Sequence, residues 1–499
     1  MIKNSSPSLL RNLIAGLGRP WPLAWRLGLV LALYAAYLPF SGYELRHIFY
    51  DAGEYWELST KFFQRGRLDF LGFQGWGRGY MGPLLLLPGR LLCRLTGCSI
   101  LAASQAMGAC WATLLFGAVL PAAWRQACGR ALSGGRWLGL VGLGFALWRD
   151  YFNFPLTDFP AFTLLLLGLL ALARCRPVWW LGAGLLLAAV LNMRPLYALA
   201  APVWLGIAFW VIKKEGRPGH VRLDSAPVSS LAAVPPRSVL WRWWALALGA
   251  ALVLGPQTLL NWRHENLATP LVLVSRHDAH RDYLHVLSWG TQLQRYETGF
   301  FPSGHRVLMV PDSVGIRQLG YSGSNGFASY TQYVAFMARY PISVAARYSR
   351  HLFNGLDLWY PTPYPLRVHS PGQTALQGLN FIALGLGLTH LFVIMLTRLR
   401  AGIRAIQGVE WLVGAAVLLP VLASVPSQVE TRYFLPLHLL LLLLAVTAQP
   451  LRWAGIRPRF KWRRLLLTLV LVTIWLAGCW QLSRVTQRLT EFDRFDLMQ

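Results

Sequence analysis

The stretch YDAGEYWELSTKFF, residues 50–63, gathers three carboxylates in a chain that is otherwise poor in acids. Asp51, Glu54 and Glu57 recur at every third residue. A helix would therefore place them on one side, with Tyr55 beside them. Carboxylates among interfacial aromatic residues are costly unless they have a partner or a task. Asp51 and Glu54 could supply a general base and its electrostatic partner, and a solvated surface helix is the alternative.

Three further stretches place acids or arginines beside apolar runs. Their candidate residues are Asp150 and Asp158 (WRDYFNFPLTDFPAF), Arg194 (LNMRPLY), and Glu430, Arg432 and Tyr433 (SQVETRYFLPLHLL). Asp158 could instead cap the helix that follows it, and each arginine could simply pair with a nearby acid. Taken together, the four stretches suggest a cavity whose acids activate an acceptor and whose arginines hold an anion such as a phosphate.

The composition indicates that most of the chain is embedded in a membrane. Of 499 residues, 55% are hydrophobic and 13% are charged, which is roughly half the charged fraction of a soluble domain. Many windows of about 20 residues, the length that crosses a bilayer core, are nearly free of charge. The net charge of +27 fits Lys and Arg in cytoplasmic loops. Because these residues are dispersed between apolar runs, they do not favour nucleic-acid binding.

We therefore expect an all-α polytopic membrane protein with about eleven transmembrane helices. The expected spans lie near residues 22–40, 100–124, 137–152, 158–173, 178–193, 194–212, 243–262, 375–397, 405–424, 434–448 and 465–482. With the N-terminus in the cytoplasm, this order places the basic loops inside. Pro88 and Gly89 interrupt the apolar segment 81–95, so we expect it to lie on or dip into the outer face.

The long segments between spans define the expected domains, because long loops usually carry function. The expected units are a cytoplasmic N-terminus (1–21), a first transmembrane helix (22–40), a first outer loop with juxtamembrane helices and the catalytic acid (41–99), a transmembrane bundle (100–262), a large outer loop domain (263–374), C-terminal transmembrane helices (375–482) and an outer tail (483–499). The function is therefore expected to face outward.

Cysteine and histidine patterns favour neither a disulfide framework nor a metal centre. The six cysteines mostly lie in or beside apolar helices, as small buried hydrophobic residues do. The histidines of the large outer loop form no tight ligand cluster with an acid, with RHDAHRD (276–282) as the one exception. We expect no cofactor and no metal, and a metal ion at RHDAHRD is the alternative.

The order of these features resembles the GT-C superfamily of polytopic glycosyltransferases, which take sugars from polyprenyl-phosphate donors. The nearest groups are the bacterial lipid A aminoarabinose transferases and the protein O-mannosyltransferase-like enzymes. The resemblance covers most of residues 20–450. The motifs that carry it are the first-loop acid in YDAGE, the Gly-Pro helix YMGPLLLLPGRLL, the acid of PLTDFPAF, the arginine of NMRPLYALAAP, and ETRYFLPLHLLLLLLA.

The resemblance implies a role for each candidate residue. Asp51 would be the general base, with Glu54 and Asp158 as further catalytic acids. The donor phosphate would contact Arg78, Arg194 and Arg432, and the substrate would contact Tyr55, Glu430 and Tyr433. The membrane would be the bacterial inner membrane, with the outer loops in the periplasm. The partners would be a polyprenyl-phosphate-linked sugar and a glycan, lipid or protein acceptor.

Two departures and two alternatives accompany the resemblance. Gly82 precedes Pro83 where aminoarabinose transferases tend to have Lys, and Ala52 and Gly53 separate acids that are often adjacent. An O-antigen ligase or polymerase would be expected to favour an outer loop centred on Arg and His. A lipid-linked sugar flippase or other transporter would show matching halves with broken helices and midplane charges, which this sequence lacks.

Overall fold

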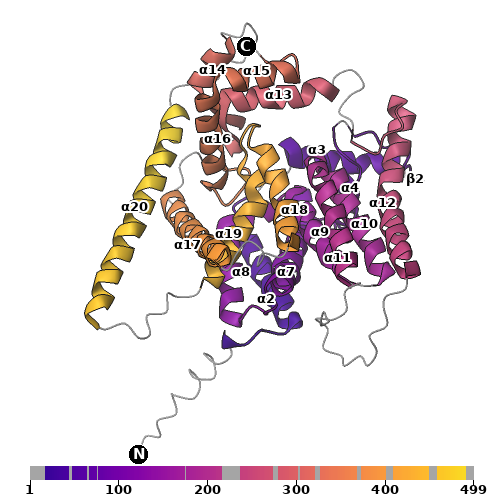
Figure 1. Ribbon diagram of the computed structural model, residues 1–499. Helices are drawn as coiled ribbons and strands as arrows, with labels where there is room; N and C mark the ends of the chain where they lie inside the picture. The colour runs from indigo at the N-terminus through magenta and orange to yellow at the C-terminus, as the bar shows by residue number, and fades with distance from the viewer. Residues whose placement is uncertain are drawn as a thin grey trace, which may run out of the picture.

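The computed structural model is built largely of α-helices (Figure 1). It describes residues 17–43, 48–64, 67–75, 77–174, 176–215, 236–272, 279–301, 304–320, 326–367, 372–400, 408–448 and 458–490. Helices from distant parts of the sequence pack side by side in a bundle, and a smaller group of elements, α13 to α16, lies at one end of it. The expectation of an all-α membrane protein agrees with this architecture.

Six helices within the described residues are long and apolar enough to cross a membrane, or seven if one bent pair forms a single span. The six are Leu23–Phe40 (α2 and η1), Ile100–Cys128 (α6, η3 and α7), Pro195–Lys213 (η5 and α11), Val239–Glu265 (α12), Gln373–Arg400 (α17) and Leu466–Thr486 (α20). The bent pair joins Gly134–Asn153 (α8 and η4) to α9 (Asp158–Leu172) at 118°.

The remaining expected spans are apolar helices that are too short to count. They are α10 (Pro177–Met193), Trp411–Ser424 within α18 (Gly408–Ser424), and Thr431–Thr447, which joins η7 (Thr431–Phe434) to α19 (Leu435–Thr447). An α-helix rises about 1.5 Å per residue, so such helices fall short of a bilayer core of about 30 Å. An apolar helix occupies every expected segment, but the expected count of eleven spans is not confirmed.

Close packing of α10 (Pro177–Met193) on α12 (Pro236–Glu265) depends on two glycines. A Cβ atom on Gly184 would lie 2.1 Å from the carbonyl oxygen of Leu246, and one on Gly249 would lie 2.0 Å from that of Leu181. Small residues at a helix interface let two backbones approach closely. This contact holds the middle of α10 against α12, and Arg194 follows directly after the end of α10.

The first loop folds onto the end of the bundle. Its elements are α3 (Tyr50–Leu58), η2 (Ser59–Phe62), the hairpin β1 (Phe63–Gln64) and β2 (Arg67–Leu68), α4 (Met81–Leu84) and α5 (Leu87–Thr96). The expected single helix over 81–95 is therefore two short helices, neither long enough to span. Pro88 sits in the first turn of α5, where its missing N–H costs no hydrogen bond.

The second long segment forms a small unit, here called the loop domain (residues 279–367). It contains α13 (Ala279–Gln292), the antiparallel strands β3 (Leu293–Phe301) and β4 (Gly304–Pro311), α14 (Ser313–Gly320), α15 (Tyr330–Arg339) and α16 (Pro341–Leu356). It has its own apolar core, formed by Leu284, Leu287, Leu319, Phe327, Phe336 and Val344. Helix α12 extends to Glu265, two residues past the expected start of this segment at residue 263.

Candidate active site

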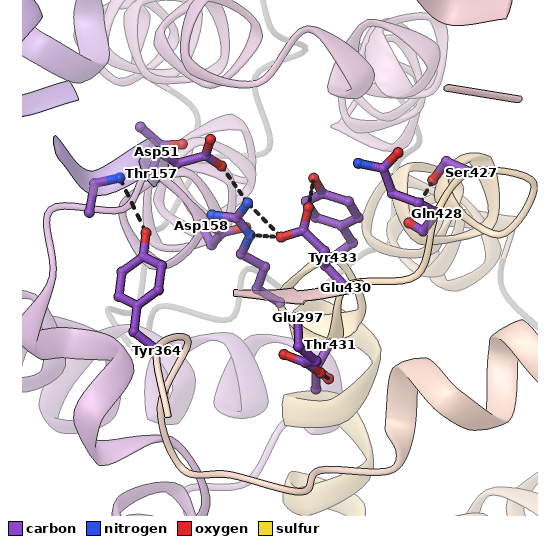
Figure 2. A network of polar contacts seen from close by, with 12 residues as sticks. Asp51, Thr157, Asp158, Glu297, Tyr364, Ser427, Gln428, Glu430, Thr431 and Tyr433 are labelled. Atoms are coloured by element: carbon purple, nitrogen blue, oxygen red, sulfur yellow. Dashed lines mark hydrogen bonds and ion pairs between the residues drawn. The ribbon is translucent and has the colours of Figure 1, made fainter. Parts of the chain in front are cut away.

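Five chain segments converge where the bundle meets the loop domain. They are α3, the first-loop residues before α4 that include Arg78, the start of α9, the end of α10 and η7. Each delivers charged residues predicted from the sequence, and Figure 2 shows several of them pointing toward one another. The structure brings all nine predicted site residues into one connected network, which we call the charged site: Asp51, Glu54, Tyr55, Arg78, Asp158, Arg194, Glu430, Arg432 and Tyr433.

Asp51 lies at the centre of the charged site. Its Oδ1 accepts from Nη2 of Arg78 at 2.7 Å, and its Oδ2 pairs with Nη2 of Arg432. The side chain remains 27% exposed. The preceding residue, Tyr50, has a φ of 55°, a left-handed conformation that bulky residues rarely adopt. Such strain is typical of sites where the surrounding structure must direct a functional side chain.

Arg78 connects Asp51 to the rest of α3. Its Nη2 lies 3.1 Å from Oε2 of Glu54, and its Nη1 lies 3.4 Å from the hydroxyl of Tyr55. The guanidinium carbon also stands 5.0 Å from the centre of the Tyr55 ring. Thr157 donates to the Tyr55 hydroxyl at 3.2 Å and so links α3 to the start of α9.

Arg432 is held from the opposite side by its neighbours in the chain. Its Nε donates to Oε2 of Glu430 at 2.6 Å, and the hydroxyl of Tyr433 donates to Oε1 of the same carboxylate at 2.7 Å. Arg432 is 9% exposed. The bond from Arg432 to Asp51 joins residues 381 positions apart in the sequence, so it directly connects the first loop to the C-terminal helices.

Arg194 and Asp158 form the third part of the site. They are ion-paired, and the Arg194 guanidinium lies 5.2 Å from the centre of the Tyr433 ring. The Asp158 side chain is 4% exposed, whereas that of Arg194 is 18% exposed. Asp158 is the first residue of α9 and follows the N-cap, Thr157, whose side chain makes no capping bond. Asp158 therefore acts as a partner of Arg194 and not as the cap of the helix.

A cavity of about 280 Å³ opens beside these residues. Its polar wall is formed by Tyr55, Arg78, Asp158, Arg194, Arg432 and Tyr433. Its apolar wall is formed by Leu196, Tyr197, Val286, Pro420, Leu435 and Pro436. The lining thus combines guanidinium groups with hydrocarbon, which suits a ligand with a charged group attached to an apolar chain.

The arginines control the protonation of Asp51. Burial raises the pKa of the Asp51 carboxyl, but the guanidinium groups of Arg432 and Arg78 outweigh burial and hold the pKa well below its usual range. Asp51 is therefore ionised at neutral pH. Arg78, Arg194 and Arg432 face four carboxylates, those of Asp51, Glu54, Asp158 and Glu430, so the site carries one more carboxylate than guanidinium.

Asp150 does not join the charged site. It accepts hydrogen bonds from the Tyr37 hydroxyl at 2.7 Å and from Nδ2 of Asn153 at 2.8 Å, and Nε of Arg149 lies 3.8 Å away. Although Asp150 and Asp158 bracket one turn, they point into different environments. The path of the chain through η4 (Arg149–Asn153) is what places these two side chains in different environments.

The sequence did not point to several residues that support the site. Tyr364 accepts a hydrogen bond from the backbone N–H of Ala52 at 3.2 Å and so holds the first turn of α3. Arg295 and Glu297 on β3 meet Thr431 beside Arg432. No spacing signal identifies these three loop-domain residues, because their relation to η7 exists only in three dimensions.

The described residues contain no group of three or more His, Cys, Asp or Glu placed to hold a metal ion. The expected alternative, RHDAHRD, lies partly outside the described residues. Cys93, Cys98, Cys110, Cys128 and Cys479 are free thiols, and Cys175 lies outside the described residues. Of the five, Cys479 is buried as expected, Cys93 and Cys98 are half-buried, and Cys110 and Cys128 are exposed.

Comparisons with known proteins identify no relative: no family model, curated protein or solved structure matches this chain.

Proposed function

We propose that this protein is a membrane glycosyltransferase of the GT-C type, which moves a sugar from a polyprenyl-phosphate donor to an acceptor at the outer face. The observation that carries the proposal is the contact of Asp51 with Arg78 and Arg432 beside the 280 Å³ cavity. A carboxylate next to clustered guanidinium groups and an apolar wall matches the needs of a lipid-phosphate donor and a proton-accepting base.

The donor phosphate binds to the arginines that the carboxylates of the charged site hold. Guanidinium groups present planar pairs of donors that can meet two phosphate oxygens at once. Because the charged site has one more carboxylate than guanidinium, a phosphate must replace carboxylates as the partner of Arg78, Arg194 or Arg432. This replacement frees an oxygen of Asp51 and weakens the field that lowers its pKa, so donor binding makes Asp51 a stronger base.

The reaction is then a single displacement at the anomeric carbon. Asp51 accepts the proton of an acceptor hydroxyl or amine, whose oxygen or nitrogen forms the new bond to that carbon. The bond from the carbon to the phosphate oxygen breaks, and its electron pair leaves with polyprenyl phosphate, with inversion at the carbon. Negative charge grows on the leaving phosphate, so positioned arginines stabilise the transition state more than the bound donor.

The test uses purified full-length protein in detergent with a panel of polyprenyl-phosphate-linked sugars. We expect release of free polyprenyl phosphate from one donor when an acceptor is present. A transporter releases none, because detergent solution has no second compartment. Release that is equal in wild type and Asp51→Asn would remove Asp51 from the reaction, whereas no release with any donor and acceptor would reject the enzyme.

The proposed setting is a bacterial inner membrane with the loop domain in the periplasm and about eleven crossings, some by short helices. In a cysteine-free background, single cysteines at Ser349, exposed in the loop domain, and at Ala131, exposed after α7 (Leu120–Cys128), can be labelled with a membrane-impermeant thiol reagent. In intact spheroplasts we expect labelling at position 349 and not at 131. The reverse pattern would invert the topology.

A further inference from the structure

A fully buried arginine joins the loop domain to the charged site. Arg295 on β3 is 1% exposed and donates from Nε to Oε1 of Glu297 at 2.7 Å. Its Nη1 donates to the carbonyl oxygen of Asp357 at 2.8 Å, and its Nη2 donates to Oγ1 of Thr431 at 3.1 Å. Its guanidinium carbon stands 3.9 Å from the centre of the Trp359 ring. One side chain thus holds β3, the segment after α16 and η7 together.

Thr431 receives this contact one residue before Arg432. Its hydroxyl accepts from Arg295 and donates to Oε1 of Glu297 at 3.5 Å, so the hydroxyl has both a donor and an acceptor. Thr431 is 2% exposed. The backbone is held as well, because the N–H of Tyr296 donates to the carbonyl oxygen of Val429 at 2.9 Å. Strand β3 therefore borders η7 along the residues that lead into Arg432 (Figure 2).

A second element confines η7 from another direction. Gly355 in α16 lies so close to Phe434 that a Cβ atom on the glycine would stand 2.2 Å from the ring. The segment from Val429 to Phe434 is thus held by β3 at its start and by α16 at its end. With the segment fixed at both ends, the hydroxyl of Thr431 determines how the middle of η7 is oriented.

We propose that Thr431, clamped by the Arg295–Glu297 pair, is a positioning residue that holds Arg432 against Asp51. This inference rests on the proposed function, because it assigns a task to a contact of the same site. A buried ion pair is costly, and apolar side chains of similar volume often stabilise a fold as well or better. The Arg295–Glu297 pair is therefore weak as a stability device. The pair instead orients the hydroxyl group of Thr431, and Thr431 directly precedes Arg432, the arginine that contacts Asp51.

The test compares Thr431→Val, which keeps the shape and removes the hydroxyl, with Thr431→Ser, which keeps the hydroxyl. We expect kcat/KM for the lipid-linked donor to fall roughly 10-fold in Thr431→Val and to remain near wild type in Thr431→Ser, because catalytic geometry is sensitive to small displacements. A loss that is equal in the two variants would overturn the proposal.

The pH profile separates positioning from mere stabilisation. Charged or titratable groups act on Asp51 from α3, the first loop, α10, β3, η7 and the segment after α16: Glu54, Arg78, Arg194, Tyr296, Glu430, Arg432, Tyr433 and Tyr364. Of these groups, Thr431→Val displaces Arg432, so the acid limb of kcat/KM should move to higher pH. A purely structural role lowers the amount of active protein without moving the limb, and an unmoved limb would contradict positioning.

A double-mutant cycle tests the same coupling without any activity. The shift in Tm caused by Arg432→Met is measured in the Thr431→Val and Thr431→Ser backgrounds. We expect a smaller shift in Thr431→Val, because Arg432 is already displaced from its partners there. Equal shifts would reject the positioning role. If wild type releases no polyprenyl phosphate and the shifts still differ, the proposed function fails while the positioning role stands.

Discussion

Two aspartates in this protein, Asp51 and Asp312, are both paired with arginines, and the comparison separates the proposed catalytic site from a structural one. Asp312 in the loop domain is 3% exposed and accepts from Nε of Arg347 and Nε2 of Gln294, each at 2.7 Å. Two backbone N–H groups, of Val314 and Gly315, also donate to it at 3.1 Å. Its carboxylate is thus saturated by close neighbours.

Asp51 has partners of another kind. Its side chain is 27% exposed, and its two arginine partners, Arg78 and Arg432, both line a cavity. Burial raises the pKa of each carboxyl, and arginine outweighs burial in each, so the pKa is lowered in both. The direction of a pKa shift therefore does not distinguish the two sites. What distinguishes them is the surroundings of the arginines: Arg78 and Arg432 line the cavity, whereas Arg347, the main partner of Asp312, is 1% exposed.

The largest expected effect is on catalysis at Asp51. Asp51→Asn preserves shape and removes the proton acceptor, so sugar transfer should fall about 10²–10⁴-fold while the protein still folds and binds donor. Asp312→Asn should lower Tm and leave transfer per folded molecule unchanged. Both quantities are measured on purified protein, by donor turnover and by thermal unfolding. Near-normal turnover in Asp51→Asn would transfer the candidate role to Glu54.

The second effect concerns stability at Asp312. Arg347 is 1% exposed, so Arg347→Met leaves the Asp312 carboxylate buried without its main partner and should cost about 3–5 kcal/mol of unfolding free energy. Arg432→Met should cost less, because Asp51 keeps Arg78 and access to water. Denaturant unfolding in detergent measures both. A larger loss in Arg432→Met than in Arg347→Met would reverse the comparison.

The third effect concerns the donor phosphate. Arg194 lines the cavity and pairs with Asp158, so Arg194→Met should reduce transfer at least ~10-fold by removing a cation that stabilises the leaving phosphate. Arg350→Met is the matched control, because Arg350 is 40% exposed and lies 3.5 Å from Asp312 in the loop domain. Release of polyprenyl phosphate is the measurement. Unchanged release in Arg194→Met removes this residue from the phosphate site.

The smallest effect is a shift in pH dependence. In wild type the pKa of Asp51 is lowered, so activity that needs its ionised form should persist until the pH falls well below the usual aspartate range. Arg78→Met removes one of the three arginines that lower this pKa, the others being Arg432 and Arg194, while burial continues to raise it. The acid limb of kcat/KM should therefore move upward by about one pH unit. Limbs that coincide in the two proteins would show that Asp51 is not the titrating group.

Much of the architecture followed from local patterns. Long apolar runs predicted helices in every expected segment, because a backbone in lipid must satisfy its own hydrogen bonds. The acids of 50–63 predicted a short helix, and α3 covers Tyr50–Leu58. Charged residues at helix ends pointed to the charged site, because such charges beside apolar runs are costly unless they meet. The nine site residues could therefore be named from the sequence, and the structure joins them.

Only the tertiary structure determined which charged and polar residues pair with one another. Asp150 and Asp158 both flank the same turn in the sequence, yet Asp158 pairs with Arg194 and Asp150 accepts a hydrogen bond from Tyr37. Contacts between Asp51 and Arg432, or between Arg295 and Thr431, depend on how distant elements pack, and no local spacing encodes them. Composition also cannot determine the number of membrane crossings, because short helices such as α10 match the apolar pattern but are not long enough to span the membrane. The sequence determines which residues are too polar to face lipid, whereas the packing of the helices and loops determines which partners those residues meet.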